Sequence, residues 1–239
     1  MRYRDLTILT IGENKLLFAT DSAGAIGSKG ADLVSIDNKG LGRFLAQVPF
    51  MEIIATKALP SYVFLPVCNE MNPTARGILE GVKEIMEEAG LDSNRINGTT
   101  EENIPTIQTA ASILVMAVVD KDFDFPKAYS GDTIYALGLP KVGNEVLEDT
   151  GEIMNLGHFK KLRSFLGIGD ILPVGSKGIA YEVREMAKSH NLEVEFLFDE
   201  PLLYKSAGPG TVALCSVPAK GSDEIKSLGL PLRAIAKLI

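Results

Sequence analysis

The sequence contains no tryptophan, two cysteines and two histidines, and aromatic residues make up only 7% of its 239 positions. The hydrophobic core must therefore be built mainly from aliphatic side chains. Cys68 and Cys215 stand in apolar runs without the close spacing of metal-binding or redox cysteines, so we expect two buried free thiols. Such sparing use of cysteine is typical of proteins of the reducing cytoplasm.

Long apolar runs and an excess of basic residues are also lacking. The longest apolar runs, such as residues 113–119, are far shorter than the ~20 residues that span a bilayer, and no segment has the pattern of a signal peptide. Lys and Arg number 24 against 31 Asp and Glu, which gives a net charge of −7. Such a chain is a poor match to nucleic acids and anionic membranes. We therefore expect a cytoplasmic protein whose partner is a small molecule, with no nucleic acid and no membrane bound.

The first half contains clear strand and helix patterns. Alternating apolar and polar residues predict a hairpin over residues 6–11 and 16–20, with Asp21 at the end of its second strand. An apolar stripe predicts a helix over residues 39–57 that Pro49 would kink. A second helix is predicted to begin with Asn72 as its cap and Pro73 in its first position, and to end at Gly90.

The remaining elements predict a two-domain α+β protein. Further strands are expected over residues 62–67, 112–119, 132–137, 192–198 and 211–217, and further helices over 142–149, 158–166 and 176–190. A charged stretch with proline, residues 121–127, is typical of a domain boundary. We predict an N-terminal domain over residues 1–125 and a smaller C-terminal domain over residues 126–239.

The segment from Thr20 to Asp32 combines small residues, two carboxylates and one lysine. Glycine allows a backbone to approach a phosphate closely, and a lysine offsets the negative charge. The candidate nucleotide contacts are Gly24, Gly27, Ser28, Lys29 and Asp32, and Asp21 is a candidate ligand for a divalent cation. The alternative is a surface loop rich in turn-forming residues, because the spacing does not match the phosphate loop G-x-x-x-x-G-K-[ST].

A second acidic segment suggests the rest of a metal site. Glu101 and Glu102 follow Thr100, which could contact the nucleotide. Adjacent carboxylates repel each other, so a buried pair needs a cation or a proton; the alternative is a capping arrangement or a solvated pair. Glu52 interrupts an otherwise apolar helix and either faces solvent or reaches into a site. Together with Asp21, these acids predict a Mg²⁺–nucleotide site.

The second half offers candidate substrate contacts. Gly175, Ser176 and Lys177 precede a predicted helix, where unpaired N–H groups could hold a phosphate or hydroxyl of a substrate. Gly208, in a glycine- and proline-rich loop, is a further candidate. The alternatives are that residues 175–177 only form the start of a helix and that the loop with Gly208 is only a tight turn. These alternatives explain the two loops equally well. His158 and His190 are interpreted as surface or helix-end residues, because no nucleophile motif accompanies them.

Several of these segments resemble the aminoimidazole ribonucleotide synthetase (PurM-like) superfamily. The resemblance rests on Asp21 with Gly24 and Lys29, on Glu52, on the run Gly98 to Glu101, and on the run Ser130 to Pro140. Within the superfamily, the chain is most similar to the alpha-ribazole kinases of cobalamin salvage. The segments that carry this closer resemblance are 70–74, 100–109, 172–179 and 207–209.

The resemblance implies an ATP-dependent enzyme, usually a homodimer, whose first domain binds ATP near the dimer interface. Relatives have metal-binding acids at positions like Asp21, Glu52 and Glu101. The chain departs from the common pattern, because it has glutamate at the last two positions, Ser22 in place of a glycine, and no Gly-Gly-Asp motif. These departures leave open which of Glu101 and Glu102 binds the metal.

The function that this resemblance implies is transfer of the ATP γ-phosphoryl group to the 5′-hydroxyl of alpha-ribazole. Asp21 and Lys29 would have catalytic roles, with ATP and Mg²⁺ as cofactors. The sequence identifies no general base. Two alternatives remain open, namely another ATP-using reaction such as a ring-closing synthetase, and a nucleotide-binding regulator without catalysis.

Overall fold

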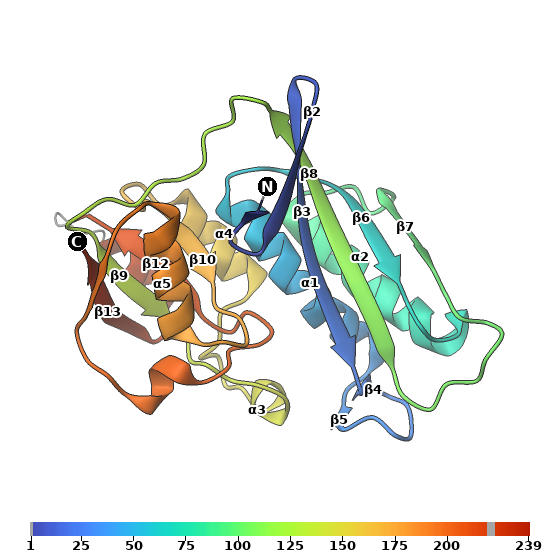
Figure 1. Ribbon diagram of the computed structural model, residues 1–239. Helices are drawn as coiled ribbons and strands as arrows, with labels where there is room; N and C mark the ends of the chain where they lie inside the picture. Colours follow the sequence, from blue (N-terminus) through green and yellow to red (C-terminus); the bar gives the residue numbers. More distant parts are fainter. Residues whose placement is uncertain (1, 219–222) are drawn as a thin grey trace. The chain divides into compact units, whose positions relative to one another are not determined.

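The computed structural model describes residues 2–218 and 223–239, which form two compact units (Figure 1). The first unit contains residues 5–53 and 58–123, and the second contains 124–239 together with the short segments 2–4 and 54–57. Strands and helices are mixed in both units, which confirms the predicted α+β class. No helix in the described part of the chain is long and apolar enough to cross a membrane.

The first unit is built on the larger sheet, in which the strand order is β1-β2-β3-β8-β6-β7. The strands are β1 (Arg2–Tyr3), β2 (Leu6–Ile11), β3 (Asn14–Gly24), β6 (Pro60–Pro66), β7 (Ile96–Thr99) and β8 (Ala110–Asp120). β6 and β7 run parallel, whereas β2, β3, β8 and β6 pair antiparallel. The predicted hairpin is confirmed, but β3 continues three residues beyond Asp21 because it pairs with β8 as far as Gly24.

The two faces of this sheet differ. Leu17, Ala19, Ile113 and Val115 on one face are at most 1% exposed, and Figure 1 shows helices α1 (Asn38–Ala55) and α2 (Arg76–Ala89) behind the strands. We call this the covered face. The residues between them in sequence lie on the opposite, open face, because side chains alternate along a strand.

Helices α1 and α2 contact each other through glycines. A Cβ atom at Gly42 would lie 2.1 Å from the carbonyl oxygen of Ile78, and one at Gly81 would lie 2.0 Å from that of Lys39. Only glycine permits such a close approach of two helix backbones. Helix α1 runs through Pro49 without interruption as one 18-residue element.

The predicted start of α2 is wrong, although its end at Gly90 is confirmed. Asn72 has extended backbone angles inside a short π-helical turn (Met71–Ala75), and α2 begins only at Arg76 without a side-chain cap. Extended backbone angles are usual for a cap residue, so the difference from the prediction is the π-helical turn, which delays the regular α-helix from Pro73 to Arg76. Gly90 ends α2 in the left-handed conformation at φ 84°, where a glycine is favoured.

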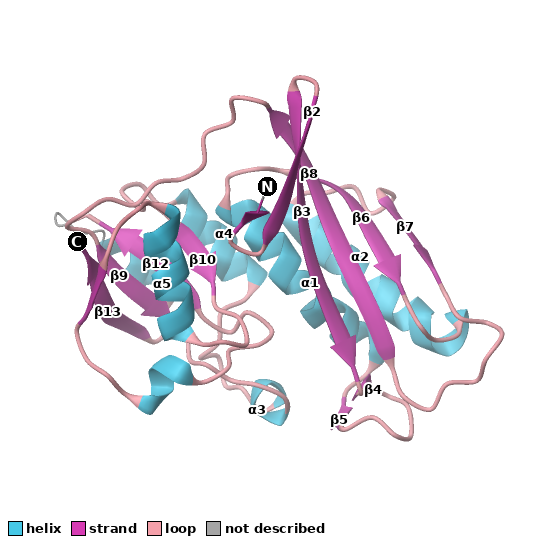
Figure 2. Cartoon of the chain, in the orientation of Figure 1, coloured by secondary structure: helices cyan, strands magenta, loops and turns pink. Residues whose placement is uncertain are grey.

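The second unit contains a five-stranded antiparallel sheet in the order β10-β12-β9-β13-β11. Its strands are β9 (Thr133–Leu137), β10 (Ile171–Pro173), β11 (Val194–Phe196), β12 (Ala213–Val217) and β13 (Leu232–Leu238), and its helices are α3 (Asn144–Leu147), α4 (Leu156–Ser164) and α5 (Ile179–Ser189). Figure 2 shows these strands in magenta and the helices in cyan. The core is almost entirely aliphatic, and α5 packs on it through Ile179, Val183 and Met186.

The expectation of two buried thiols needs correction, and the interpretation of His190 as a helix-end residue is confirmed. Cys215 is fully buried on β12, but Cys68 is exposed, because it follows the alternating burial of residues 63–67 onto the solvent side. His190 does end helix α5, yet its side chain is only 9% exposed. It lies beside Asp170, 2.7 Å from the carboxylate, in a buried polar cluster that also contains Arg4.

Candidate functional site

Three loops meet at one end of the larger sheet. Backbone hydrogen bonds join the loop after β3 to the loop before β8, from Ala25 N–H to the Thr109 carbonyl (2.9 Å) and from Ala31 N–H to the Ile107 carbonyl (3.1 Å). The loop after β6 joins them through the Asn69 carbonyl, which accepts from Glu101 N–H at 3.0 Å. We call residues 25–37, 67–75 and 100–109 the three-loop end. Both predicted segments of the nucleotide site therefore lie together.

Asp32 holds the first loop in shape. Its carboxylate accepts hydrogen bonds from Thr109 N–H (2.7 Å), Thr109 Oγ1 (2.7 Å) and Lys29 N–H (2.8 Å). Burial acts to raise the pKa of Asp32, but these donors outweigh it and lower the pKa. Gly27 is required beside it, since a Cβ there would lie 2.4 Å from Thr109 Oγ1. Asp32 and Gly27 thus build the loop, and their contacts are to protein.

Lys29 forms an ion pair with Glu70 across two of the loops. The Nζ–Oε2 distance is 2.8 Å, and the Lys29 side chain is only 17% exposed. Glu70 also accepts a short hydrogen bond from Thr74 Oγ1. Burial opposes ionisation of Glu70, but Lys29 and Thr74 overcome it and lower its pKa to about 2. A phosphate that binds Lys29 must therefore compete with Glu70, a residue that sequence reasoning did not assign to the site.

Asn69 is a second residue that the sequence did not single out. It is fully buried, its Nδ2 donates to Thr106 Oγ1 (2.6 Å) and to the Gln108 carbonyl (2.8 Å), and its Oδ1 accepts from Ala110 N–H (2.9 Å). A polar residue directly after a buried strand was the only signal in the sequence. Asn69 fixes the third loop against the end of β8.

Glu101 and Glu102 already accept hydrogen bonds from groups within the three-loop end. Glu101 Oε1 accepts from the N–H groups of Asn103 (2.6 Å) and Ile104 (3.1 Å), which lowers the pKa of Glu101. Glu102 Oε1 accepts from Met71 N–H (2.7 Å) and Thr100 Oγ1 (2.8 Å). Such hydrogen bonds are those expected of the alternative in which the two glutamates cap the loop backbone. They orient both carboxylates within the three-loop end.

Asp21 lies on the covered face of the sheet, not at a strand end. It pairs with Ile113 across β3 and β8, in the row beyond Leu17 and Ala19. Burial raises the pKa of Asp21 to about 6, and a hydrogen bond from Ser22 N–H (2.8 Å) only partly offsets this effect. A carboxylate that burial makes difficult to ionise gains most from a nearby cation.

A cavity of about 530 Å³ opens on the same face. The apolar part of its wall includes Leu65, Val67 and Leu79, and Thr100 and Lys83 contribute polar atoms. Leu65 pairs with Gly98 of β7, and the β6–β8 register places Leu65 beside Ile113, the partner of Asp21. Because neighbouring strands are roughly 5 Å apart, Asp21 lies roughly 10 Å from this wall. The cavity shares Met71 and Thr100 with the three-loop end.

The carboxylates that the sequence predicts to bind a metal do not form a preformed site among the described residues. Glu52 is half-buried near the end of α1. In the described ranges, no three side chains of His, Cys, Asp or Glu are grouped closely enough to hold a metal ion. The assignment of Asp21, Glu52, Glu101 and Glu102 to a metal therefore stays a prediction, in which ATP phosphates would supply the other ligands.

The predicted substrate loops of the second unit lie next to each other. The Gly175 carbonyl accepts hydrogen bonds from Gly178 N–H and Ala207 N–H, both at 3.2 Å, so residues 175–178 adjoin the loop that contains Gly208. Ser176 and Lys177 are exposed. Lys177 Nζ donates to Tyr181 Oη at 3.1 Å and lies 4.1 Å from the centre of its ring. Helix α5 begins at Ile179, three residues later than predicted.

Comparison with known proteins identifies the fold. No protein-family model and no curated protein matches the sequence. Solved structures do match it over nearly its whole length. Thiamine monophosphate kinase (ThiL) from Aquifex aeolicus superposes with a TM-score of 0.67 at 15% identity, covering 98% of this chain and 88% of that chain. A complex of AaThiL with AMPPCP and TMP gives 0.65 at 15% identity, covering 98% and 84%.

The hydrogenase maturation protein HypE from E. coli also matches, with a TM-score of 0.62 at 14% identity, covering 94% of this chain and 79% of that chain. The chain has the PurM-like fold. At such low identity the likeness establishes the fold alone, and a PurM-like fold serves proteins of different function. The activity must be argued from the site.

Proposed function

We propose that this PurM-like protein is an ATP-dependent small-molecule kinase, and that its acceptor is the 5′-hydroxyl of alpha-ribazole. The observation that carries the kinase proposal is the arrangement of the covered face. A cavity of about 530 Å³ lies in the same region as Asp21 and the three-loop end with Lys29. An apolar wall suits a nucleobase, and the cation and carboxylates beside it suit Mg²⁺ and phosphates. The AaThiL complex with AMPPCP supports nucleotide binding by this fold.

The residues present fit a Mg²⁺ ion that arrives with the nucleotide. Asp21 is a half-buried carboxylate whose ionisation is opposed by burial, and Glu101 and Glu102 offer hard oxygen ligands. When bound, Mg²⁺ neutralises charge on the phosphates. Lys29 would leave Glu70 and contact the phosphate oxygens. The hydroxyl oxygen of the acceptor forms the new P–O bond as the bond to ADP breaks, and its proton passes to solvent.

The acceptor is assigned to the second unit. Gly175, Ser176, Lys177 and Gly208 lie on two adjoining loops, in which Ser176 and Lys177 are exposed. Backbone N–H groups at a helix start and a lysine suit a hydroxyl or a phosphate. The segment likeness to alpha-ribazole kinases supports alpha-ribazole as the acceptor. The rivals are another ATP-using reaction, because HypE shares the fold, and a nucleotide-binding regulator without catalysis.

A substrate screen tests this proposal. The protein is incubated with Mg-ATP and candidate hydroxyl compounds, including alpha-ribazole, and products are read by mass spectrometry for the gain of one phosphoryl group. Phosphorylation of alpha-ribazole supports the full proposal. Phosphorylation of a different compound supports the proposed kinase activity but rejects alpha-ribazole as the acceptor. ATP binding without any product favours the regulator.

A homodimer is proposed to form through the open face of the larger sheet. Two cross-strand rows on this face are apolar, Leu9–Leu16–Val118 and Phe18–Met116–Tyr62. Leu9 and Val118 are 47% and 42% exposed, although single chains rarely expose contiguous apolar patches of this kind. We expect light scattering to give the mass of a dimer, and Val118→Glu to give that of a monomer. A wild-type monomer would reject this interface.

Lys29→Met is expected to weaken ATP binding roughly tenfold or more while leaving adenosine binding unchanged, because the variant removes a charge-assisted phosphate contact. Calorimetry with both ligands measures this difference. Lys39→Met is the matched control, since Lys39 forms a similar ion pair with Glu84 at 2.6 Å in the same unit. Glu70→Gln should strengthen ATP binding by releasing Lys29. Equal losses for ATP and adenosine would remove Lys29 from the phosphate site.

Lys177→Ala is expected to raise the KM for the acceptor or to lower kcat, while the affinity for ATP stays near that of the wild type. The reason is that Lys177 lies in the second unit, whereas the proposed nucleotide site lies in the first. Steady-state kinetics with varied acceptor and calorimetry with ATP alone measure the two effects separately. A large loss of ATP affinity would assign this loop to the nucleotide instead.

A further inference from the structure

The cavity of about 530 Å³ in the first unit lies between helix α2 and the edge of the larger sheet. Ala75, Leu79 and Lys83 follow one another at intervals of four residues, so they share one face of the helix. Leu65 of β6 and Ile96 of β7 belong to the facing wall. We call this space the α2 cavity.

The lining of the α2 cavity contains one charged side chain. This is Lys83, and among the described residues no aspartate or glutamate lines the space. Glu102 contacts two lining residues, because its Oε1 accepts from Met71 N–H (2.7 Å) and Thr100 Oγ1 (2.8 Å). It forms no ion pair with Lys83. The lining therefore has one positive charge, in a chain whose net charge is −7.

The ammonium group of Lys83 makes no hydrogen bond or ion pair within the described part of the chain. Glu80 and Glu87 lie three residues before it and four residues after it on the same helix, but both are exposed and neither pairs with it. The Lys83 side chain is half-buried and its Nζ atom reaches solvent, so a ligand can contact it. A lysine that loses hydration without a counter-charge is stabilised by an anion.

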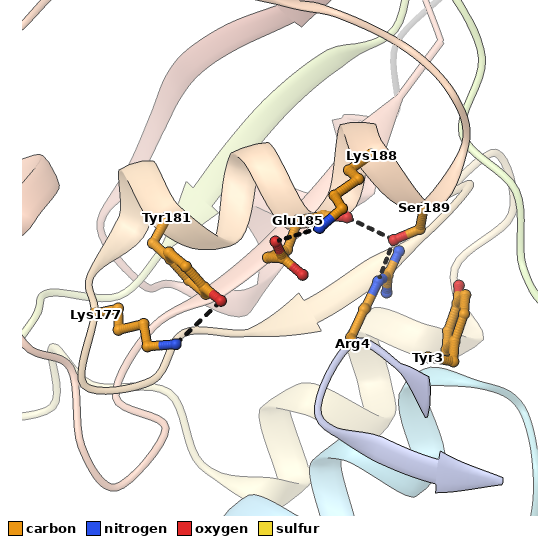
Figure 3. Close-up of a pocket in the computed structure, with 7 residues that line it drawn as sticks. All are labelled: Tyr3, Arg4, Lys177, Tyr181, Glu185, Lys188 and Ser189. Atoms are coloured by element: carbon orange, nitrogen blue, oxygen red, sulfur yellow. Dashed lines mark hydrogen bonds and ion pairs between the residues drawn. The ribbon is translucent and has the colours of Figure 1, made fainter. Parts of the chain in front are cut away.

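A cavity of about 390 Å³ along helix α5 of the second unit differs in this respect (Figure 3). Its Lys177 donates to Tyr181 Oη at 3.1 Å. Its Lys188 lies 3.7 Å from a carboxylate oxygen of Glu185. Both of these lysines have partners within the protein. Of the two cavities, the α2 cavity is therefore the one whose lysine is available to a ligand.

We propose that the α2 cavity binds an organic monocarboxylate with an apolar body. The carboxylate accepts a hydrogen bond from Lys83 Nζ, and the apolar body packs against the aliphatic walls. A carboxylate carries one negative charge, which one ammonium group balances. A phosphate monoester carries roughly −1.5 to −2 at pH 7 and would leave uncompensated charge beside apolar walls. The volume falls within the range of small-molecule sites, roughly 300–1,000 Å³.

The carboxylate would compete with ATP, because the proposed nucleobase site uses the same cavity. Only this competition rests on the proposed function, since binding of a carboxylate needs neither ATP nor turnover. An apolar organic acid would thus act as an inhibitor of nucleotide binding.

The test is calorimetry of the full chain with 3-phenylpropionate, 3-phenylpropanol and 3-phenylpropylamine, which share one apolar body and differ in charge. Acetate supplies the charge without the body. We expect 3-phenylpropionate to bind in the millimolar range or tighter, the alcohol to bind roughly fivefold or more weakly, and the amine and acetate not to bind measurably. Amide NMR shifts should fall on residues 75–83 and 96–100. No binding of 3-phenylpropionate, an alcohol that binds as tightly, or shifts outside these residues would overturn the proposal.

Lys83→Met separates the charge of the lysine from its packing, because methionine keeps an unbranched apolar side chain and removes the charge. The preference for 3-phenylpropionate over the alcohol should disappear in this variant, while the alcohol binds as in the wild type. A lysine with only a structural role would not change this preference. Lys39→Met is the matched control, since Lys39 pairs with Glu84 at 2.6 Å on the neighbouring helix and does not line the cavity. An unchanged preference in Lys83→Met would reject the assignment.

Titration of Mg-ATP with and without saturating 3-phenylpropionate distinguishes this inference from the proposed function. We expect the apparent affinity for ATP to fall when the carboxylate is present. Carboxylate binding with unchanged ATP affinity would support the carboxylate site and reject both the competition and the α2 cavity as the nucleobase site. ATP binding without carboxylate binding would overturn the inference and leave the kinase proposal standing.

Discussion

Asp21→Asn is expected to abolish Mg²⁺-dependent turnover and, at the same time, to stabilise the ligand-free protein at pH 7. The carboxylate lies on the covered face, and burial raises its pKa to about 6. Its charge therefore costs folding free energy in the absence of a cation. An asparagine keeps the shape and removes both the charge and its cost. We expect turnover to fall roughly 100-fold or more, as when a preorganised charge is removed from an active site.

The gain in stability should depend on pH in a defined direction. Below about pH 4, Asp21 is protonated in both folded and unfolded states, so wild type and variant should be equally stable. As the pH rises from about 4 to about 6, the unfolded state releases its proton first, and the wild type loses stability that the variant keeps. The difference should reach about 1–3 kcal/mol above pH 6. Urea unfolding between pH 4 and pH 8 measures it.

Two outcomes would contradict this account. Normal turnover in Asp21→Asn would show that Asp21 is not a metal ligand. A variant less stable than the wild type at pH 7 would show that the carboxylate is already compensated in the ligand-free protein. Asp32→Asn is an informative comparison, because the pKa of Asp32 is lowered by its hydrogen bonds. That substitution should destabilise the protein, in the opposite direction to Asp21→Asn.

Asp170→Asn is expected to destabilise the second unit by about 3–5 kcal/mol, the usual effect of breaking a buried ion pair. Asp170 is 1% exposed and contacts both Arg4 and His190. Its backbone N–H also donates to Ser216 Oγ at 2.8 Å, so the residue lies at the centre of a buried network. The substitution removes the carboxylate that pairs with the buried guanidinium of Arg4. Urea denaturation at pH 7 measures the loss.

The lowered pKa of the Asp170 carboxylate predicts that the folded protein loses stability in acid. Burial acts to raise the pKa of Asp170, but the charge of Arg4 and the hydrogen bonds from His190 and Arg4 lower it overall. A lowered pKa contributes stability that is present above the unfolded value near 4 and is lost as the pH falls through the folded value. In Asp170→Asn this acid-dependent loss should disappear.

The controls are an exposed pair and a double variant. Asp223→Asn breaks the exposed pair with Lys226 and should leave the free energy of unfolding almost unchanged, because solvent screens the pair. The double variant Arg4→Met, Asp170→Asn should lose less than the sum of its single changes, because it removes both buried charges. A small loss in Asp170→Asn itself would mean that water reaches Arg4 and that the pair is not structural.

Features that depend on neighbouring residues could be predicted from the amino-acid sequence. The hairpin of β2 and β3 follows from alternation and a turn, the α2 stripe from helical period, and the end of α2 from Gly90. The composition of residues 20–32 predicts a phosphate loop, and this assignment stays a prediction. Very short strands were not predicted. Strand β10, for example, has three residues, and an alternating pattern cannot be recognised over so few positions.

Which residues from distant parts of the chain contact each other depends on tertiary packing. Lys29 pairs with Glu70 from 41 positions away, and Arg4 with Asp170 from 166. Asp21 was expected at a strand end facing a cleft, but the register with β8 placed it on the covered face, where burial raises its pKa. Strand register, burial and long-range pairing are collective properties of the packed chain, and they set charge states that local composition does not contain. Residue types therefore suggest candidate roles, and packing determines where those residues lie and how strongly they are charged.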